Sequence, residues 1–541
     1  MREKTSRRVF AGTYWVLASY FTLQNHSQNQ FRGANLSFSS QETSDLWGWS
    51  DPGSYVKLGR AFVETGGVPG DYEWIINLWT PGMSAVNASA IFLFGLNGNY
   101  LIGVIFLNLL VWFFALYLIF KLVTRFFNDF IAAIVTLWFV TSDFFQDYLI
   151  GYLAVYSDGL STGITTIVIS LILLMGRKKW STDNPRCITR KQLSLSRHFR
   201  IEETLIAVVA GLLLGSLVYL RGQYFLVIQL GFVLLAIIYI SKGIKKTVSF
   251  VLLSSARSKL NRQGLKIWQR SLPLRPSQST HWALIFVSLV AASLSLLPYA
   301  LWKSDRIGDI PWDTGGAYAL TSSDSFAFMA NWGSDFPDFI SQGGQGSACR
   351  IDPELCAEVQ AAEMSSDQPF SIYDSEPFTA KEFRSMTLRT IASHPISWVS
   401  DRAPYLWKYL TAGDDISVPE SSHRGRFLSQ LGLIAIIPFL KRKDRITHEQ
   451  IQFSLPPLSV LGPIAIIVVA VLGPPMLTHF ETRYLLSIRV AMEILSKIGA
   501  VLLLQIFVKW LRTGLELSDK VERRTNSVSR FRSELDPSDP A

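Results

Sequence analysis

The chain has 541 residues, of which 49% are hydrophobic and only 17% are charged, and its mean hydropathy is +0.25. This composition is too apolar for a water-soluble protein and indicates a chain that crosses the membrane several times. The formal charge of +9 does not by itself indicate a nucleic-acid partner, because the Lys and Arg residues cluster in loops on one side of the membrane. We therefore expect a polytopic membrane protein with no nucleic-acid partner.

About 20 apolar residues are needed to cross a bilayer, and somewhat fewer where the membrane is thin. The basic start "REKTSRR" precedes an apolar run with no small-residue cleavage site, so we predict an uncleaved first helix with a cytosolic amino terminus. In total we predict about ten transmembrane helices, at residues 9–23, 100–120, 127–142, 159–176, 204–220, 223–241, 282–302, 426–440, 456–476 and 485–508.

The loops show which side each helix end faces. Residues 177–203 carry eight basic and three acidic side chains, and residues 242–280 carry nine basic and none acidic. Both loops are therefore expected in the cytosol. Residues 303–400 hold fourteen acidic and six basic side chains, which agrees with the outside position that the helix count requires.

One apolar segment, Thr80 to Gly95, decides this count. It has only about 14 residues after its proline, and counting it as a span would place Lys121 and Arg125 outside the cytosol. We interpret it as an interfacial or re-entrant helix that begins at Pro81. The first outside loop then covers residues 24–99.

These boundaries divide the chain into four parts. We predict an amino-terminal transmembrane bundle (1–302) that includes the first outside loop, an extracytoplasmic segment (303–425), carboxy-terminal transmembrane helices (426–508) and a cytosolic tail (509–541), disordered from residue 512. Cys349 and Cys356 lie in the extracytoplasmic segment. They could form a short disulfide or remain free thiols.

Several motifs, in order along the chain, resemble those of the GT-C membrane glycosyltransferases. This family takes sugar from a polyprenyl-phosphate carrier and includes protein O-mannosyltransferases and lipid A aminoarabinose transferases. The motifs are "DPGSY" (51–55), "WTPGM" (79–83), "YSDGLSTG" (156–163), "AGLLLGSLVYLRGQ" (210–223), "IASHPISWV" (391–399) and "HFETRYLLS" (479–487). The resemblance implies an all-α, GT-C-like bundle with interfacial helices in the first outside loop and a larger outside segment.

Two departures from the family pattern concern the acceptor. The family commonly has a second acid beside the first-loop aspartate, or a Pro-Pro-Gly, whereas here Pro52 follows Asp51 and Thr80 precedes Pro81. The subfamily, and with it the choice among a glycan, lipid or protein acceptor, therefore stays open.

Asp51 is the candidate catalytic base. Nucleotide sugars are not supplied outside the cytosol, so a transferase there needs a sugar donor attached to a lipid. A carboxylate would take the proton of the acceptor hydroxyl, and a direct displacement with one base inverts the anomeric centre. The structural alternative is that Asp51 only caps the helix that follows it. Tyr55, one helical turn later, is a supporting residue.

Arg483 and Arg221 are the candidates for holding the carrier phosphate. Each lies at the outer end of an apolar run, where a guanidinium is costly unless it is paired. Snorkelling of these side chains to lipid headgroups is the alternative. Tyr484 and Glu481 crowd the same turn as Arg483 and are therefore supporting candidates.

Three acids, Asp143, Asp147 and Asp158, fall in or beside the second outside loop. One of them could position the acceptor or share a divalent cation with Asp51, whereas such acids more often cap helices. Asp143 and Asp158 are counted as supporting residues, and the metal question is left open.

The sequence therefore favours an integral membrane glycosyltransferase of the bacterial inner (plasma) membrane, with an extracytoplasmic active site and membrane lipid around it. A transporter or flippase of lipid-linked saccharides is the alternative. It would be expected to show repeated halves and charges in the middle of spans, whereas here the acids are expected in outside loops. A non-catalytic scaffold is a third possibility.

Overall fold

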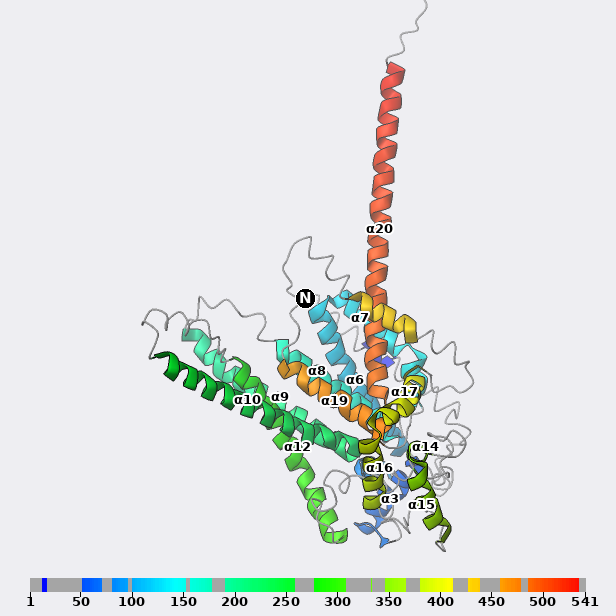
Figure 1. The fold of residues 1–541 in the computed structure, drawn as a ribbon. Helices are drawn as coiled ribbons and strands as arrows, with labels where there is room; N and C mark the ends of the chain where they lie inside the picture. Colours follow the sequence, from blue (N-terminus) through cyan, green and yellow to red (C-terminus); the bar gives the residue numbers. More distant parts are fainter. Residues whose placement is uncertain are drawn as a thin grey trace, which may run out of the picture.

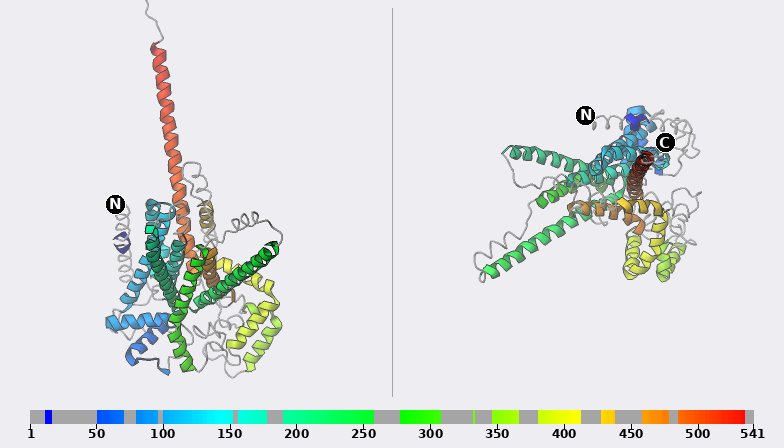
Figure 2. Two further views of the ribbon diagram at one scale, coloured as in Figure 1. Left: turned by 90° about the vertical axis from the view of Figure 1, so that its left-hand side faces the viewer. Right: turned by 90° about the horizontal axis from the view of Figure 1, so that it is seen from above.

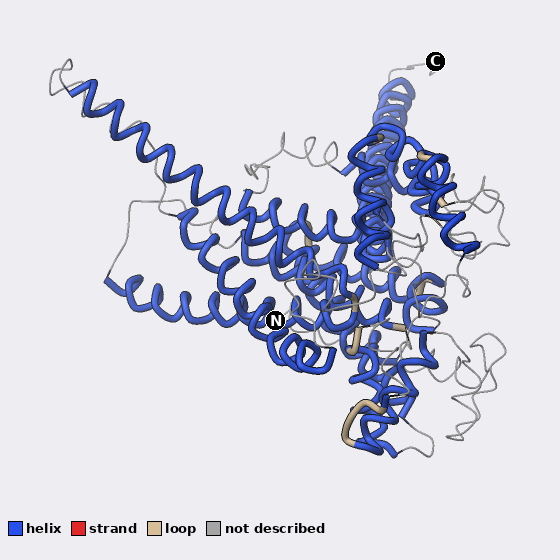
Figure 3. Tube along the Cα trace, turned by 60° about the horizontal axis from the view of Figure 1, so that its bottom comes forward, coloured by secondary structure: helices blue, strands red, loops and turns tan. Residues whose placement is uncertain are grey.

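The computed structural model describes residues 12–16, 51–70, 80–95, 100–151, 156–177, 190–257, 277–307, 332, 346–365, 380–411, 427–437, 458–477 and 485–534. Within these ranges the secondary structure is helical and includes no strand (Figures 1 and 3). The predicted all-α membrane protein is therefore confirmed for the part of the chain that is described.

Six described helical segments are long and apolar enough to cross a membrane, and each overlaps a predicted span. They are Gly103–Phe126, Ser157–Leu174, Glu203–Leu220, Gly222–Ser241, Trp282–Trp302 and Leu486–Val508. Shorter apolar helices occupy the predicted spans at 127–142, 426–440 and 456–476, and only residues 12–16 of the first predicted span are described.

The helices that contain these segments pack against one another in a bundle. They are α6 (Tyr100–Phe126), α7 (Asp129–Val140), the π-helix η3 (Phe144–Gly151), α8 (Ser157–Arg177), α9 (Arg190–Leu220), the short η5 (Gly222–Tyr224), α10 (Phe225–Arg257), α12 (Ser277–Ile307), α19 (Leu458–Leu477) and α20 (Leu486–Glu534). Gly211 allows α9 to approach α12 closely, because a side chain there would collide with the Ser288 carbonyl. Ser288 also donates a hydrogen bond across the same contact, to the Ala207 carbonyl at 2.8 Å.

Two helices of the first outside loop lie against the outer end of this bundle, meaning the end predicted to face away from the cytosol. They are α3 (Asp51–Thr65), which ends at Gly66 with a φ of +69°, and α5 (Gly82–Phe94). A β-carbon at Gly82 would collide with the backbone of Tyr219 and Leu220, so glycine lets α5 start directly on the end of α9. The carboxy-terminal end of α5 exposes Phe92, Leu93 and Phe94, as an interfacial helix requires.

Four further helices form a small unit within the predicted extracytoplasmic segment (Figure 2). They are α14 (Ser347–Ile351), α15 (Pro353–Ser365), α16 (Ala380–Ser393) and α17 (Pro395–Thr411). Cys349 and Cys356 are joined by a disulfide, which resolves the choice that the sequence left open. Trp398 of α17 donates a hydrogen bond from its indole N–H to the Met476 carbonyl of α19 at 2.7 Å. This bond ties the unit to the bundle.

An ion pair holds α14 against α17 in the same unit. The Arg350 guanidinium donates to both carboxylate oxygens of Asp401, at 3.0 and 2.8 Å. Burial raises the pKa of Asp401, but hydrogen bonds from Arg350 and Ser347, with the charges of Arg350 and Arg402, outweigh it and hold that pKa below its ordinary value. Arg402 is completely buried, with its guanidinium 4.9 Å from the centre of the Trp398 ring.

The helix α20 continues far beyond its membrane-spanning part and projects from the bundle (Figures 1 and 2). It reaches Glu534, so the disorder predicted for residues 512–534 is not what the structure has. The reason is local. No proline interrupts the chain between residue 486 and Pro537, and closely spaced opposite charges support a solvated helix.

Candidate active site

The predicted residues Asp158 and Arg221 meet at the outer end of the bundle. Asp158 lies in the first turn of α8, and Arg221 directly follows α9. The backbone of Arg221 is extended, which breaks the helical run between α9 and η5 and sends the side chain toward α8. Its Nη1 forms an ion pair with Oδ1 of Asp158, with side chains only 13% and 1% exposed. The guanidinium of Arg221 therefore has a buried partner within the protein, which disfavours snorkelling to lipid headgroups, the alternative considered for this residue.

A group of hydroxyls connects this ion pair with the start of α20. Thr165 of α8 donates a hydrogen bond to the Tyr224 hydroxyl at 2.8 Å, and that hydroxyl lies 3.4 Å from Oγ of Ser487. Ser161 and Thr162 are buried one turn earlier on α8. Four elements, α8, η5, α9 and α20, thus contribute polar groups at the outer end of the bundle.

The first outside loop reaches the same place through α3. Tyr55 is buried in one apolar cluster with Leu220, Tyr224 and Leu485. Asp51 begins α3 one turn before Tyr55, and its side chain lies outside the described residues, so its role as the base stays a prediction. The buried Tyr55 thus helps to fix this loop on the bundle, and its supporting role in the site stays a prediction.

Other predicted site residues are not brought to this point by the described part of the chain. Arg483, Tyr484 and Glu481 lie outside the described residues, next to the buried Leu485. Asp143 is exposed in the turn between α7 and η3. The side chain of Asp147 is not described either, so the roles predicted for these acids and for the Arg483 turn stay predictions.

An apolar pocket of about 660 Å³ opens beside the ion pair. Leu160 of α8 and Leu220 of α9 line it, and these residues lie two and one positions from Asp158 and Arg221. Helices α3, α5 and α12 supply the other walls. The site thus combines a buried charge pair with an adjoining apolar cavity, an arrangement suited to an amphiphile with an anionic head.

No protein-family model matches the chain, and a comparison with curated proteins gives no match. The solved structures that match the chain include the following two. The archaeal oligosaccharyltransferase AglB from Archaeoglobus fulgidus, in complex with an inhibitory peptide and a dolichol-phosphate, aligns with 95% of this chain and 52% of its own, at 10% identity and a TM-score of 0.42.

The second is ArnT from Cupriavidus metallidurans bound to undecaprenyl phosphate, which aligns with 92% of this chain and 77% of its own, at 13% identity and a TM-score of 0.32. This chain spans about half the length of the archaeal oligosaccharyltransferase. Both structures contain a polyprenyl phosphate, a dolichol-phosphate in the first and undecaprenyl phosphate in the second.

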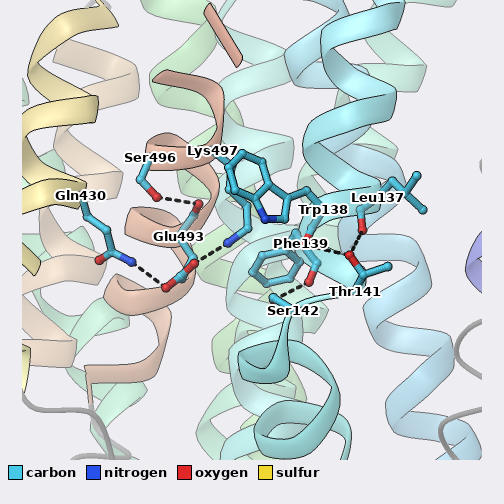
Figure 4. A network of polar contacts seen from close by, with 9 residues as sticks. All are labelled: Leu137, Trp138, Phe139, Thr141, Ser142, Gln430, Glu493, Ser496 and Lys497. Atoms are coloured by element: carbon cyan, nitrogen blue, oxygen red, sulfur yellow. Dashed lines mark hydrogen bonds and ion pairs between the residues drawn. The ribbon is translucent and has the colours of Figure 1, made fainter. Parts of the chain in front are cut away.

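The sequence analysis missed a second buried ion pair, within the spanning part of α20 (Figure 4). Glu493 accepts a hydrogen bond from Gln430 Nε2 at 2.6 Å on one oxygen and pairs with Lys497 Nζ on the other. The Lys497 ammonium lies 5.6 Å from the centre of the Trp138 ring and 5.7 Å from that of Phe139, both on α7. The expectation that the acids lie in outside loops is therefore wrong for Glu493.

This pair had a detectable signal in the sequence. Glu493 and Lys497 are four residues apart within an apolar run, the spacing at which helical side chains pair. An acid and a base at that spacing within a span also satisfy each other's charge.

The predicted divalent cation has no candidate ligand set among the described residues, where no three His, Cys, Asp or Glu side chains converge. Asp158 is already paired with Arg221. The carboxylate of Asp51 lies outside the described residues, so a divalent cation shared by Asp51 and another acid stays an expectation.

Proposed function

We propose that the chain is an integral membrane glycosyltransferase that moves a sugar from a polyprenyl-phosphate carrier to an acceptor hydroxyl on the extracytoplasmic side, with inversion. The observation that carries this proposal is a convergence at one end of the bundle. The first turns of α3, the Asp158–Arg221 pair and the start of α20 meet around one apolar cluster. Each of these elements adjoins a residue predicted for the reaction.

The chemistry assigns a separate task to each group. The acceptor oxygen attacks the anomeric carbon while the bond from that carbon to the phosphate oxygen breaks, and the carrier phosphate leaves with the electron pair. Asp51 receives the proton of the acceptor hydroxyl. Arg483, with Arg221, holds the phosphate by charge-assisted hydrogen bonds. Asp158 orients the Arg221 guanidinium from its buried position.

A transporter or flippase of lipid-linked saccharides is the second candidate, and one observation favours it. The Glu493–Lys497 pair is a pair of charges inside a span, as a transporter would have. Both carboxylate oxygens already have partners, and aromatic rings cover the ammonium. This environment fits a fixed contact between helices better than a path for a substrate.

The function is tested by incubating the purified protein with radiolabelled polyprenyl-phosphate sugars and a crude acceptor fraction of the cell envelope. We expect the release of free carrier phosphate, matched by label in a new product. Movement of intact labelled carrier across a proteoliposome membrane without its cleavage would instead support the transporter.

The side of the reaction is tested separately with the native cysteines. Cys187 lies in a loop predicted to be cytosolic, and Cys349 and Cys356 are joined in a disulfide. An impermeant thiol reagent should leave Cys187 unlabelled in intact cells and label it after permeabilisation. Labelling of Cys187 in intact cells would invert the topology and place Asp51 in the cytosol.

A further inference from the structure

The apolar pocket beside the ion pair has exposed apolar side chains at its rim. Phe62 of α3 and Trp302 at the end of the spanning segment of α12 both line the pocket and are 49% and 36% exposed, so they mark its mouth. Val63 and Leu301, next to them in the chain, are also exposed apolar side chains. A mouth with such a rim admits ligands from the membrane rather than from water.

Two residues that line this pocket carry a buried hydroxyl with no hydrogen-bond partner among the described residues. These hydroxyls are Oγ of Ser84 on α5, a residue only 4% exposed, and the phenolic oxygen of Tyr299 on α12. A buried hydroxyl without a partner costs free energy, and such groups are rare in folded proteins. These two hydroxyls therefore indicate a ligand that carries a hydrogen-bond acceptor.

Other hydroxyls that line the same pocket show the contrast. Ser89 donates to the Ala85 carbonyl at 2.8 Å, Ser216 to the Leu212 carbonyl at 3.0 Å, and Tyr219 to the Ser295 carbonyl at 2.8 Å. The lack of a partner thus distinguishes Ser84 and Tyr299 from otherwise similar neighbours.

The chemistry of the hydrocarbon chain separates two classes of lipid. An isoprenoid chain has no hydrogen-bonding atom along its length and would leave both hydroxyls unsatisfied. A fatty acyl chain joined through an ester or amide brings a carbonyl oxygen, which accepts hydrogen bonds from hydroxyls. The pocket therefore suits an acyl lipid better than the isoprenoid carrier.

We infer that the pocket between α3, α5, α9 and α12 binds the acyl chain of a lipid, with its ester or amide carbonyl accepting hydrogen bonds from Ser84 and Tyr299. Leu160 and Leu220 place the inner end of this pocket beside the Asp158–Arg221 pair. If the proposed glycosyl transfer is correct, on which this second step rests, the acyl lipid is the acceptor, and the isoprenoid donor binds elsewhere.

The test uses the full chain reconstituted in nanodiscs and two photoreactive probes. One is a diester glycerophospholipid with a photoreactive group at the end of an acyl chain, and the other is a polyprenyl phosphate with the same group at its far end. We expect the diester probe to label peptides from α5 and α12. Unlabelled diester lipid should compete for this labelling better than the matched diether lipid, which has the same chains and no carbonyl.

Variants then test the two hydroxyls. Ser84→Ala and Tyr299→Phe should each reduce the diester preference roughly two- to tenfold, the value of one neutral hydrogen bond. The matched controls Ser89→Ala and Ser216→Ala, whose hydroxyls already have backbone partners, should retain the preference. A loss of the diester preference that is restricted to Ser84→Ala and Tyr299→Phe would show that these two hydroxyls bind the carbonyl of the lipid.

Three results would overturn the inference: no labelling of α5 and α12 by the diester probe, stronger labelling there by the polyprenyl probe, or an unchanged diester preference in both variants. The experiment needs no sugar transfer. Pocket labelling without any transferase activity would therefore count against the proposed function alone, whereas transfer without pocket labelling would count against the pocket alone.

Discussion

Two buried ion pairs of this protein, Asp158–Arg221 and Glu493–Lys497, have the same charges and contrasting surroundings. The first joins two helix ends, and an apolar pocket and a group of hydroxyls adjoin it. The second lies within a single helix, and Gln430 and two aromatic rings complete its contacts. Burial of a charge pair is therefore not sufficient to mark an active site, and the space beside the pair is the informative feature.

The largest effect is expected at the outer site, from Asp51→Asn. The amide keeps the shape of the side chain and most of a helix-capping bond, but it cannot accept the acceptor's proton, so transfer should fall roughly 10²- to 10⁴-fold. The rate of sugar transfer and the thermal unfolding midpoint are measured together. The exposed Glu64, near the other end of α3, provides the control, Glu64→Gln.

Transfer at the parent rate by the Asp51→Asn variant would make Asp51 a helix cap only. The base would then have to be another acid, and the contact of α3 with the region of the Asp158–Arg221 pair would no longer support a catalytic role for this loop.

The Glu493–Lys497 pair should instead affect the stability of the folded protein. Lys497→Met leaves the Glu493 carboxylate buried with one partner fewer, and breaking a buried pair in this way costs about 3–5 kcal/mol. The double variant Glu493→Gln with Lys497→Met should recover much of this loss, since no uncompensated charge remains. Thermal unfolding in a fixed detergent measures the three proteins. A Lys497→Met protein that unfolds at the normal temperature yet transfers no sugar would show that the Glu493–Lys497 pair takes part in the reaction.

A smaller effect is expected on donor binding at the outer pair. Arg221→Gln should weaken the binding of polyprenyl phosphate roughly ten- to hundredfold, the value of hydrogen bonds from a charged donor. Asp158→Asn removes the orientation of the guanidinium but keeps the cation, so its affinity should fall less. Titration of each variant with polyprenyl phosphate gives the two affinities. Equal losses in both variants would show a structural pair with no direct part in binding.

The smallest effect concerns the partly exposed pair Arg350–Asp401, which shows how much of such a pair's strength depends on burial. The native pKa of Asp401 is held below its unfolded value, so the pair stabilises the fold above that unfolded value of about 4, and this contribution is lost as the pH falls through the native pKa. Thermal unfolding between about pH 3 and pH 7 should show less loss of stability on acidification in Asp401→Asn. Identical pH profiles for the variant and the parent would exclude Asp401 from the acid response.

Sequence patterns were sufficient for the spans that the structure describes and for the start of helix α5. An apolar run of about 20 residues has few alternatives to a membrane helix, and Pro81 marks the start of α5. The pairing of Asp158 with Arg221 could not be predicted, because it joins residues 63 positions apart through the packing of α8 on α9. The pocket has the same origin, since five separate helices form it.

The short helix α7 has a consequence for the bilayer itself. It runs only from Asp129 to Val140, with the polar residues Asn128 and Thr141 at its two ends. Twelve residues of α-helix measure roughly 18 Å, against about 30 Å for a typical hydrocarbon core. If α7 crosses the membrane, as the sequence predicts for residues 127–142, the bilayer beside it must become thinner to match it, at a cost of fractions of a kcal/mol for each ångström. A bilayer of shorter acyl chains relieves this mismatch, so lipid thickness acts directly on the helix that packs against Lys497.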